Sequence, residues 1–91
     1  MRALSVRQAA QFFKLLGDET RLEVLRILAR QGEVSVTALC EALKQSQPAV
    51  SHHLMLLRTG HLVSTRRQGH LVLYRIDDPD LRQLLDCLGT A

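Results

Sequence analysis

The sequence predicts a mainly helical single domain of five helices with one small β-hairpin. Apolar residues recur at three- and four-residue steps in five separate segments, which indicates amphipathic helices. Before the last of these segments, residues 61–76 change to β-branched, aromatic and partly alternating residues that are typical of paired strands. The 91 residues contain no linker, repeat or low-complexity stretch, so one domain is expected to account for residues 1–91.

The first two predicted helices occupy the N-terminal third of the chain. Ser5 is the expected cap of the first helix (residues 5–16), which ends at Gly17. Its apolar stripe consists of Val6, Ala9, Ala10, Phe13 and Leu16. The second helix starts at Asp18 or Thr20 and ends at Gly32, and its stripe consists of Leu22, Leu25, Leu28 and Ala29. Residues 33–35 follow as an extended link, a candidate for a minor strand that pairs with the hairpin.

Residues 37–58 have the pattern of a helix-turn-helix. Thr37 is the expected cap of a short helix that ends at the polar turn Lys44-Gln45-Ser46. Ser46 caps the next helix, and Pro48 lies in its first turn, where an N–H has no helical partner. The face that packs consists of Val50, Leu54 and Leu57, and the face left free consists of Gln47, Pro48, Ser51, His52 and Met55. Gly60 suits a left-handed cap at the end of this helix.

Residues 62–76 are predicted to form a β-hairpin that follows this helix. Two strand-like runs, residues 61–67 and 70–76, have Gln68-Gly69 between them. The expected tip, residues 66–70, is polar and basic. The residues expected to return to the core are Leu71, Leu73 and Val63. A helix with a polar face followed by a basic hairpin is a winged helix, so the predicted fold is a winged helix-turn-helix.

Positive charge is concentrated on this same part of the chain. Residues 44–76 contain five Lys or Arg, all four histidines and no Asp or Glu, whereas the other residues contain seven basic and nine acidic side chains. Such polarity is the electrostatic footprint of nucleic-acid binding, and double-stranded DNA is the expected partner. The alternatives are a solvated basic face and a winged helix that serves as a protein-interaction module. A protein-interaction module, however, has no need of an acid-free segment.

The last predicted helix (residues 79–89) raises a question of burial. Residues 77–80 form an acidic helix start, and the stripe that follows consists of Leu81, Leu84, Leu85 and Leu88. A domain of this size buries only roughly 60–65% of its unfolded surface. We therefore expect a homodimer whose interface contains these leucines and Phe13 of the first helix, with two reading helices one DNA turn apart on an inverted repeat. The alternative is that the last helix packs only on its own core.

Composition argues against several other classes of protein. No apolar run approaches the ~18 residues of a membrane span, and no signal-peptide core is present, so a cytoplasmic protein is expected. Cys40 and Cys87 are too few for a disulfide framework or a zinc motif. Ser51 beside His52 is the one candidate for a nucleophile and base, but adjacent helical residues point about 100° apart and form no relay. We therefore expect no enzyme.

Four motifs in this order resemble the ArsR/SmtB family of bacterial transcriptional repressors. They are GDETRLEVL (17–25), LCEAL (39–43), SQPAVSHHL (46–54) and RQGHLVLYR (67–75). The resemblance covers nearly the whole chain. It implies a dimeric winged-helix repressor that leaves its operator when an effector, often a metal ion, binds.

The resemblance also implies which residues contact DNA. They are Gln47, Pro48, Ser51, His52 and Arg58 of the reading helix and Arg66, Arg67 and His70 of the wing. Gln pairs well with the edge of adenine, Ser contacts bases or phosphates, and wing arginines enter the minor groove or hold phosphates. An alternative role for Ser51 is a hydrogen bond within its own helix. His53 is expected to lie on the packed side.

The effector sites of the best-known family members are not expected here. Ser35 and Thr37 stand where arsenic- and cadmium-sensing members have a Cys-x-Cys pair. Asp78 and Asp80 match the first ligands of the zinc-sensing type, whose later ligands would lie beyond Ala91. Thiol-switch members pair a cysteine at the end of the second helix with one in the last helix. This chain has Arg26 near the first of these positions and only Cys87 in the last helix. No metal or cofactor is therefore expected, and the effector is unknown. The alternatives are a metal- or thiol-responsive site of another kind and repression without any effector.

Overall fold

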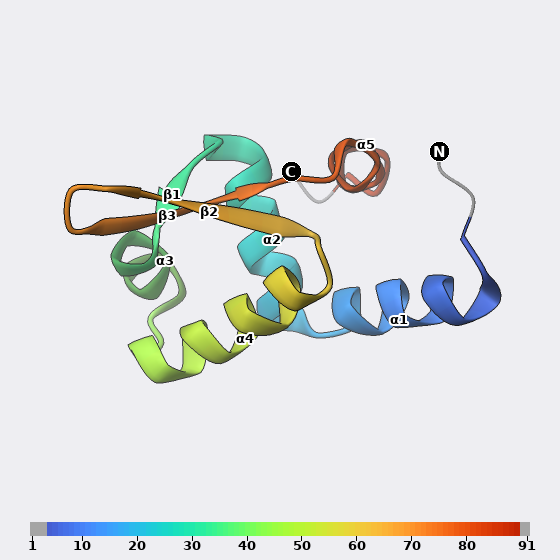
Figure 1. Cartoon of the computed structure of the whole chain (residues 1–91), viewed down its shortest axis with the longest axis horizontal. Coiled ribbons are helices and arrows are strands. Elements are labelled where there is room, and N and C mark those ends of the chain that lie inside the picture. Colours follow the sequence, from blue (N-terminus) through green and yellow to red (C-terminus); the bar gives the residue numbers. More distant parts are fainter. Residues whose placement is uncertain (1–3, 90–91) are drawn as a thin grey trace.

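A computed structural model describes residues 4–89, which form five helices and a three-stranded sheet. In chain order these are α1 (Val6–Leu16), α2 (Glu19–Gln31), β1 (Val34–Ser35), α3 (Val36–Leu43), α4 (Gln47–Thr59), β2 (Val63–Gln68), β3 (Leu71–Ile76) and α5 (Pro79–Cys87). The tip of the β2–β3 hairpin lies at one end of the molecule, and α1 and α5 lie at the other (Figure 1). This arrangement confirms the predicted winged helix-turn-helix. None of the helices in residues 4–89 could cross a bilayer.

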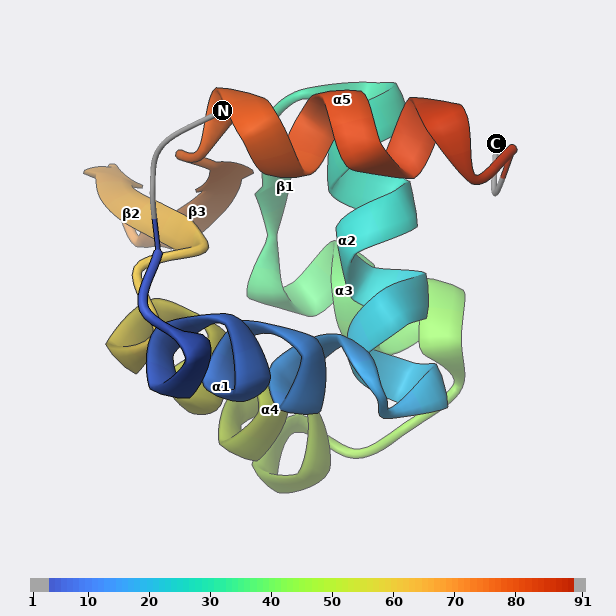
Figure 2. The same ribbon diagram turned by 90° about the vertical axis from the view of Figure 1, so that its right-hand side faces the viewer.

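Helix α2 forms the centre of the hydrophobic core. Val24, Leu25 and Leu28 are completely buried, and Ile27 is 9% exposed. α2 contacts α1, α3, α4, α5 and β3, and it runs between α5 on one side and α1 with α4 on the other (Figure 2). The predicted stripe contained Leu25 and Leu28 but missed Val24 and Ile27. A helix that is covered on most of its circumference buries more than one stripe.

The sheet has the antiparallel order β1-β3-β2. Val34 lies opposite Tyr74, so the link at residues 33–35 does supply a minor strand to the hairpin. The predicted turn at Gln68-Gly69 is wrong by one residue, because Gln68 pairs with Leu71 and leaves Gly69-His70 between the strands. Gly69 has a φ of 63°, a conformation that glycine adopts without strain.

The strand register decides which hairpin residues reach the core. Val63 and Leu73 are buried as predicted, with 3% and 9% exposure. Leu71 was also expected in the core but is exposed. Leu71 lies opposite Gln68 near the tip of the hairpin, where it lines a surface groove beside α3 and does not reach the core.

Two predicted helix caps are corrected. Ser35, rather than Thr37, caps α3, because the backbone of Ser35 is extended and its Oγ accepts the N–H of Ala38 at 3.1 Å. At the end of α4, Gly60 has an ordinary φ of −78°, and the next residue, His61, adopts the left-handed conformation. Gly60 instead lies close to α1, since a Cβ atom there would overlap Cδ1 of Leu15, so a larger residue would require the side chain of Leu15 to move.

Helix α5 packs on the core through part of its leucine stripe. Leu81 and Leu85 are 0% and 2% exposed and belong to the same core cluster as α2. This corrects the prediction that all four leucines serve a subunit interface. Two leucines turned away from this buried pair are left for a partner, Leu84, which is half-buried, and Leu88, which is 57% exposed.

The corrected cap can be tested by measuring stability. Ser35→Ala should lower the free energy of unfolding by about 1 kcal/mol, because the N–H of Ala38 loses its acceptor. The matched control Thr37→Ala removes an exposed hydroxyl and should change it by less than about 0.5 kcal/mol. Urea denaturation at a fixed protein concentration measures both values. A larger loss for Thr37→Ala than for Ser35→Ala would place the cap at Thr37 after all.

Candidate nucleic-acid interface

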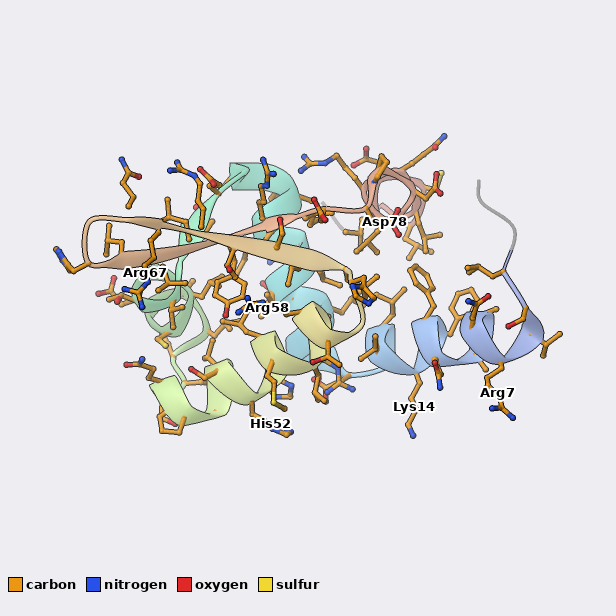
Figure 3. The ribbon with its side chains drawn as sticks, in the orientation of Figure 1. Arg7, Lys14, His52, Arg58, Arg67 and Asp78 are labelled. Atoms are coloured by element: carbon orange, nitrogen blue, oxygen red, sulfur yellow. The ribbon has the colours of Figure 1, made fainter. Side chains whose placement is uncertain are left out.

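Helix α4 has one buried face and one exposed polar face. Ser46 caps it by accepting the N–H of Ala49 at 3.4 Å, and Pro48 lies in its first turn, both as predicted. The buried face consists of Val50, Leu54 and Leu57, each 0% exposed. The predicted free face, which consists of Gln47, Pro48, Ser51, His52 and Met55, is exposed, as are Ala49, Arg58 and Thr59. His52 points away from the body of the molecule (Figure 3). The predicted reading face is therefore exposed to solvent.

The turn between α3 and α4 holds this face in a fixed position. Lys44 has a φ of 55° and so adopts the left-handed conformation. Glycine is frequent in such turns, and here Lys44 takes that conformation instead. The N–H of Gln45 donates to the carbonyl of Cys40 at 3.2 Å, which closes the end of α3. The side-chain amide of Gln45 also donates to Oγ1 of Thr20 at 3.3 Å. The turn is thereby attached to the first turn of the central helix α2.

Arg21 connects α4 to the junction of α1 and α2. Its Nε donates to the carbonyl of Leu15 at 2.8 Å, and its Nη1 lies 3.3 Å from Nδ1 of His53. The carboxylate of Asp18 accepts the N–H of Arg21 at 3.0 Å, which lowers the pKa of Asp18, and lies 3.7 Å from the same ring nitrogen of His53. His53 therefore holds α4 in place from its partly buried side, as predicted.

The two wing arginines have different environments. Arg66 lies opposite Leu73 and Arg67 lies opposite Val72, so their side chains leave opposite faces of the hairpin. Arg66 forms a two-pronged ion pair with Glu33, with distances of 2.6 and 2.7 Å. Arg67 is exposed and lies on the side of the hairpin that faces α3 and α4 (Figure 3). Arg66 is thus partly neutralised, whereas Arg67 shares the side of the reading face.

Glu33 is a partner of the wing that the sequence did not predict. The hydrogen bonds from Arg66 lower the pKa of Glu33, so this carboxylate stays ionised at neutral pH and persists as the partner of Arg66. Glu33 lies outside the acid-free segment 44–76, and only the pairing of β1 with β3 brings it beside the wing. The extended character of residues 33–35 was the one sequence signal for this contact.

Several of the other predicted contact residues line two grooves on the surface. Gln47 and His70 line a groove between α3, the start of α4 and the tip of the hairpin. Ser51, Arg58 and Tyr74 line a second groove between α4 and the sheet. Gln47, Ser51 and Arg58 of α4 and His70 of the hairpin therefore line two grooves on this part of the surface. Its geometry is that of a helix with an exposed polar face flanked by a cationic hairpin.

The metal-ligand sets of the known sensor types do not fit the residues present. Oγ of Ser35 serves as the cap of α3, and the carboxylate of Asp78 caps α5 by accepting the N–H of Asp80 at 3.0 Å. Both cysteines are free thiols, Cys40 half-buried and Cys87 exposed. Residues 4–89 contain no group of three or more His, Cys, Asp or Glu side chains that could hold a metal ion. Ala91, beyond which the later ligands of the zinc-sensing type would lie, is outside the described residues.

A separate apolar surface lies at the end of the molecule away from the wing. Val6 and Phe13 of α1 are 88% and 61% exposed, and Leu88 at the end of α5 is 57% exposed. α1 and α5 face the viewer together in Figure 2, with the sheet on the far side of the molecule. These exposed side chains make α1 and α5 the candidate helices for a subunit interface.

Comparison with known proteins shows which protein family the chain resembles. Residues 18–65 match the family model described as "Bacterial regulatory protein, arsR family". The chain is 52% identical over 66 residues to the "Arsenical resistance operon repressor" of Escherichia coli (strain K12). That match covers 72% of this chain but only 56% of the E. coli protein, so this chain corresponds to little more than half of its relative.

Solved structures show the same fold. HlyU from Vibrio cholerae N16961, in its reduced form, superposes with a TM-score of 0.85 at 33% identity and covers 90% of this chain and 85% of its own. A protein from Mycobacterium bovis gives a TM-score of 0.82 at 33% identity, with 99% and 88% of the two chains covered. It is described as a homodimeric winged helix-turn-helix DNA-binding domain and a possible ArsR-family regulator. On the family match and the identity to the E. coli repressor, the chain belongs to the ArsR family of bacterial regulatory proteins.

Proposed function

We propose that the protein is a dimeric repressor that acts in the cytoplasm and binds an inverted-repeat DNA operator. The observation that carries this proposal is the exposed polar face of α4 beside Arg67, within a segment that contains no acidic residue. A major groove about 12 Å wide admits such a helix, and a cationic hairpin at its side suits the phosphate backbone. Gln47, Ser51 and His52 are the proposed base-reading residues.

The proposed dimer joins two chains through α1 and α5. The exposed side chains of Phe13 and Leu88 lie on these helices, and the Mycobacterium bovis relative is described as a homodimer. An interface at this end places both wings at the far ends of the dimer and both copies of α4 on either side of a two-fold axis. Two-fold symmetry in the protein then corresponds to two-fold symmetry in the operator.

Selection of bound DNA from a random pool at physiological salt tests the proposal directly. An enriched inverted repeat with half-sites about one helical turn apart is expected. Recovery of a single half-site would contradict the dimer arrangement. A pool that shows no enrichment, with no preference over competitor DNA, would contradict sequence-specific binding.

The reading helix should determine sequence preference. Ser51→Ala or His52→Ala should weaken binding to the selected operator by about 1–3 kcal/mol and leave binding to random DNA nearly unchanged, because base contacts are lost. Gln83→Ala, an exposed change on α5, is the control and should affect neither. Fluorescence anisotropy with both DNAs measures the effects. Equal losses on operator and random DNA would show that α4 does not read bases.

The wing should contribute through charge. Arg67→Ala should weaken binding to all sequences and reduce the dependence of log K on log salt by about one. Arg66→Ala should have a smaller effect, because Glu33 already neutralises Arg66. Glu33→Gln should strengthen binding to random DNA, since it removes a negative charge and releases Arg66. Anisotropy titrations at several salt concentrations would contradict this division if both arginine variants lost the same affinity and Glu33→Gln changed nothing.

The exposed apolar end should carry the dimer. Phe13→Glu or Leu88→Glu should produce monomers with weak operator binding, because each places a charge in the proposed interface. Met55→Glu is the matched control, since Met55 is a similarly exposed apolar residue (51%) on a different face, and it should remain a dimer. Sedimentation velocity distinguishes the species. Intact dimers for both test variants would move the interface elsewhere.

A further inference from the structure

We infer that α1 is a second DNA-contacting element, in which Arg7 and Lys14 hold backbone phosphates beside the reading helix. This inference rests on the proposed DNA-binding function and extends it to a helix outside the basic segment 44–76. The ligand is the phosphodiester backbone, bound without regard to base sequence.

Arg7 and Lys14 project from the same side of α1. Seven residues separate them, so they differ by only about 20° around the helix axis and by about 10 Å along it. Both are exposed, whereas the half-buried residues that attach α1 to the core are Phe12, Leu15 and Leu16. The two cations therefore form a short row on a side of α1 that the protein core does not use.

This row lies on the same side of the molecule as the reading face of α4. In Figure 3, Arg7, Lys14 and His52 all extend from the lower edge of the ribbon, two of them from α1 and one from α4. Helices α4 and α1 together form this edge along the longest dimension of the molecule, which is 38 Å (Figure 1). At about 3.4 Å per base pair, a duplex lying along this edge beneath α4 also passes beneath α1.

Both cations are available for phosphates. α1 contains no acidic residue, and no carboxylate in residues 4–89 forms an ion pair with the side chain of Arg7 or Lys14. Other arginines of this protein have internal partners, as Arg21 has with the carbonyl of Leu15 and Arg66 with Glu33. Unpaired cations on long side chains suit phosphate contacts, which position a protein on DNA without selecting bases.

The row is also separate from the proposed subunit interface. Phe13 precedes Lys14 and Val6 precedes Arg7, so each apolar residue points about 100° away from its basic neighbour. One side of α1 packs on the core, a second presents the apolar residues and a third presents the cations. In a dimer joined at this end, the two rows lie closer to the centre of the operator than the two wings do.

The salt dependence of DNA binding tests this inference. The double variant Arg7→Gln/Lys14→Gln should weaken operator and random DNA by the same factor and reduce the slope of log K against log salt by about 1.8 for each protomer, at about 0.9 per lost phosphate contact. Arg7→Lys/Lys14→Arg keeps both charges and should retain the full slope. The charge-matched control is Arg30→Gln/Arg82→Gln, on the end of α2 and on α5 at the opposite edge of the molecule, and it should change the slope by much less.

The outcomes separate this inference from the proposed function. Operator binding with an unchanged slope in the Arg7/Lys14 variant would overturn the contact by α1 and leave the repressor proposal intact. An equal loss of slope in the Arg30/Arg82 control would also overturn it, because net charge alone would then explain the effect. Sedimentation shows whether the variant is still dimeric, and a half-site duplex gives the slope per protomer if it is not. Absence of DNA binding by the unmodified protein would instead contradict the proposed function itself.

Discussion

The burial of α2 is the constraint on which the other elements depend. With only three aromatic residues in the chain, the core is built from aliphatic side chains, and burying each of them stabilises the fold by roughly 1.5–3 kcal/mol. Val24, Leu25 and Leu28 are completely enclosed only because four other helices and β3 contact α2 from different directions. The orientation of α4 follows from this packing, since its buried residues fix which of its sides remains exposed.

The sequence predicted the elements whose signals are local. Helical spacing identified all five helices, and the same spacing separated the buried residues of α4 from Ser51 and His52 on its exposed face. The features that depend on pairing between distant segments were not predictable in this way. The hairpin turn was displaced by one residue because the register is set by the pairing of Gln68 with Leu71, and the partner of Arg66 is a glutamate 33 residues away in the chain. Leu81 and Leu85 were misassigned because periodicity identifies an apolar side of a helix but not the surface that covers it.

Arginine serves two purposes in this small domain. Arg21 holds two carbonyls and a histidine, which connects three helices at the side of α4 opposite its reading face. Arg66 joins the outer face of the wing to the residue before β1. Arg21 thus helps to hold the reading helix in place, whereas the charge of Arg66 is already paired on the surface. Net charge alone therefore overstates the positive field available to a polyanion.

The close approach of Leu15 to Gly60 brings α1 against the joint between α4 and the wing. Leu15 is on α1, whose exposed side is the proposed subunit interface, and Gly60 lies where α4 ends and the chain turns toward the wing. A larger residue at position 60 would have to displace the side chain of Leu15. The packing of α1 is therefore coupled, through one leucine side chain, to the point where the chain leaves the reading helix for the wing.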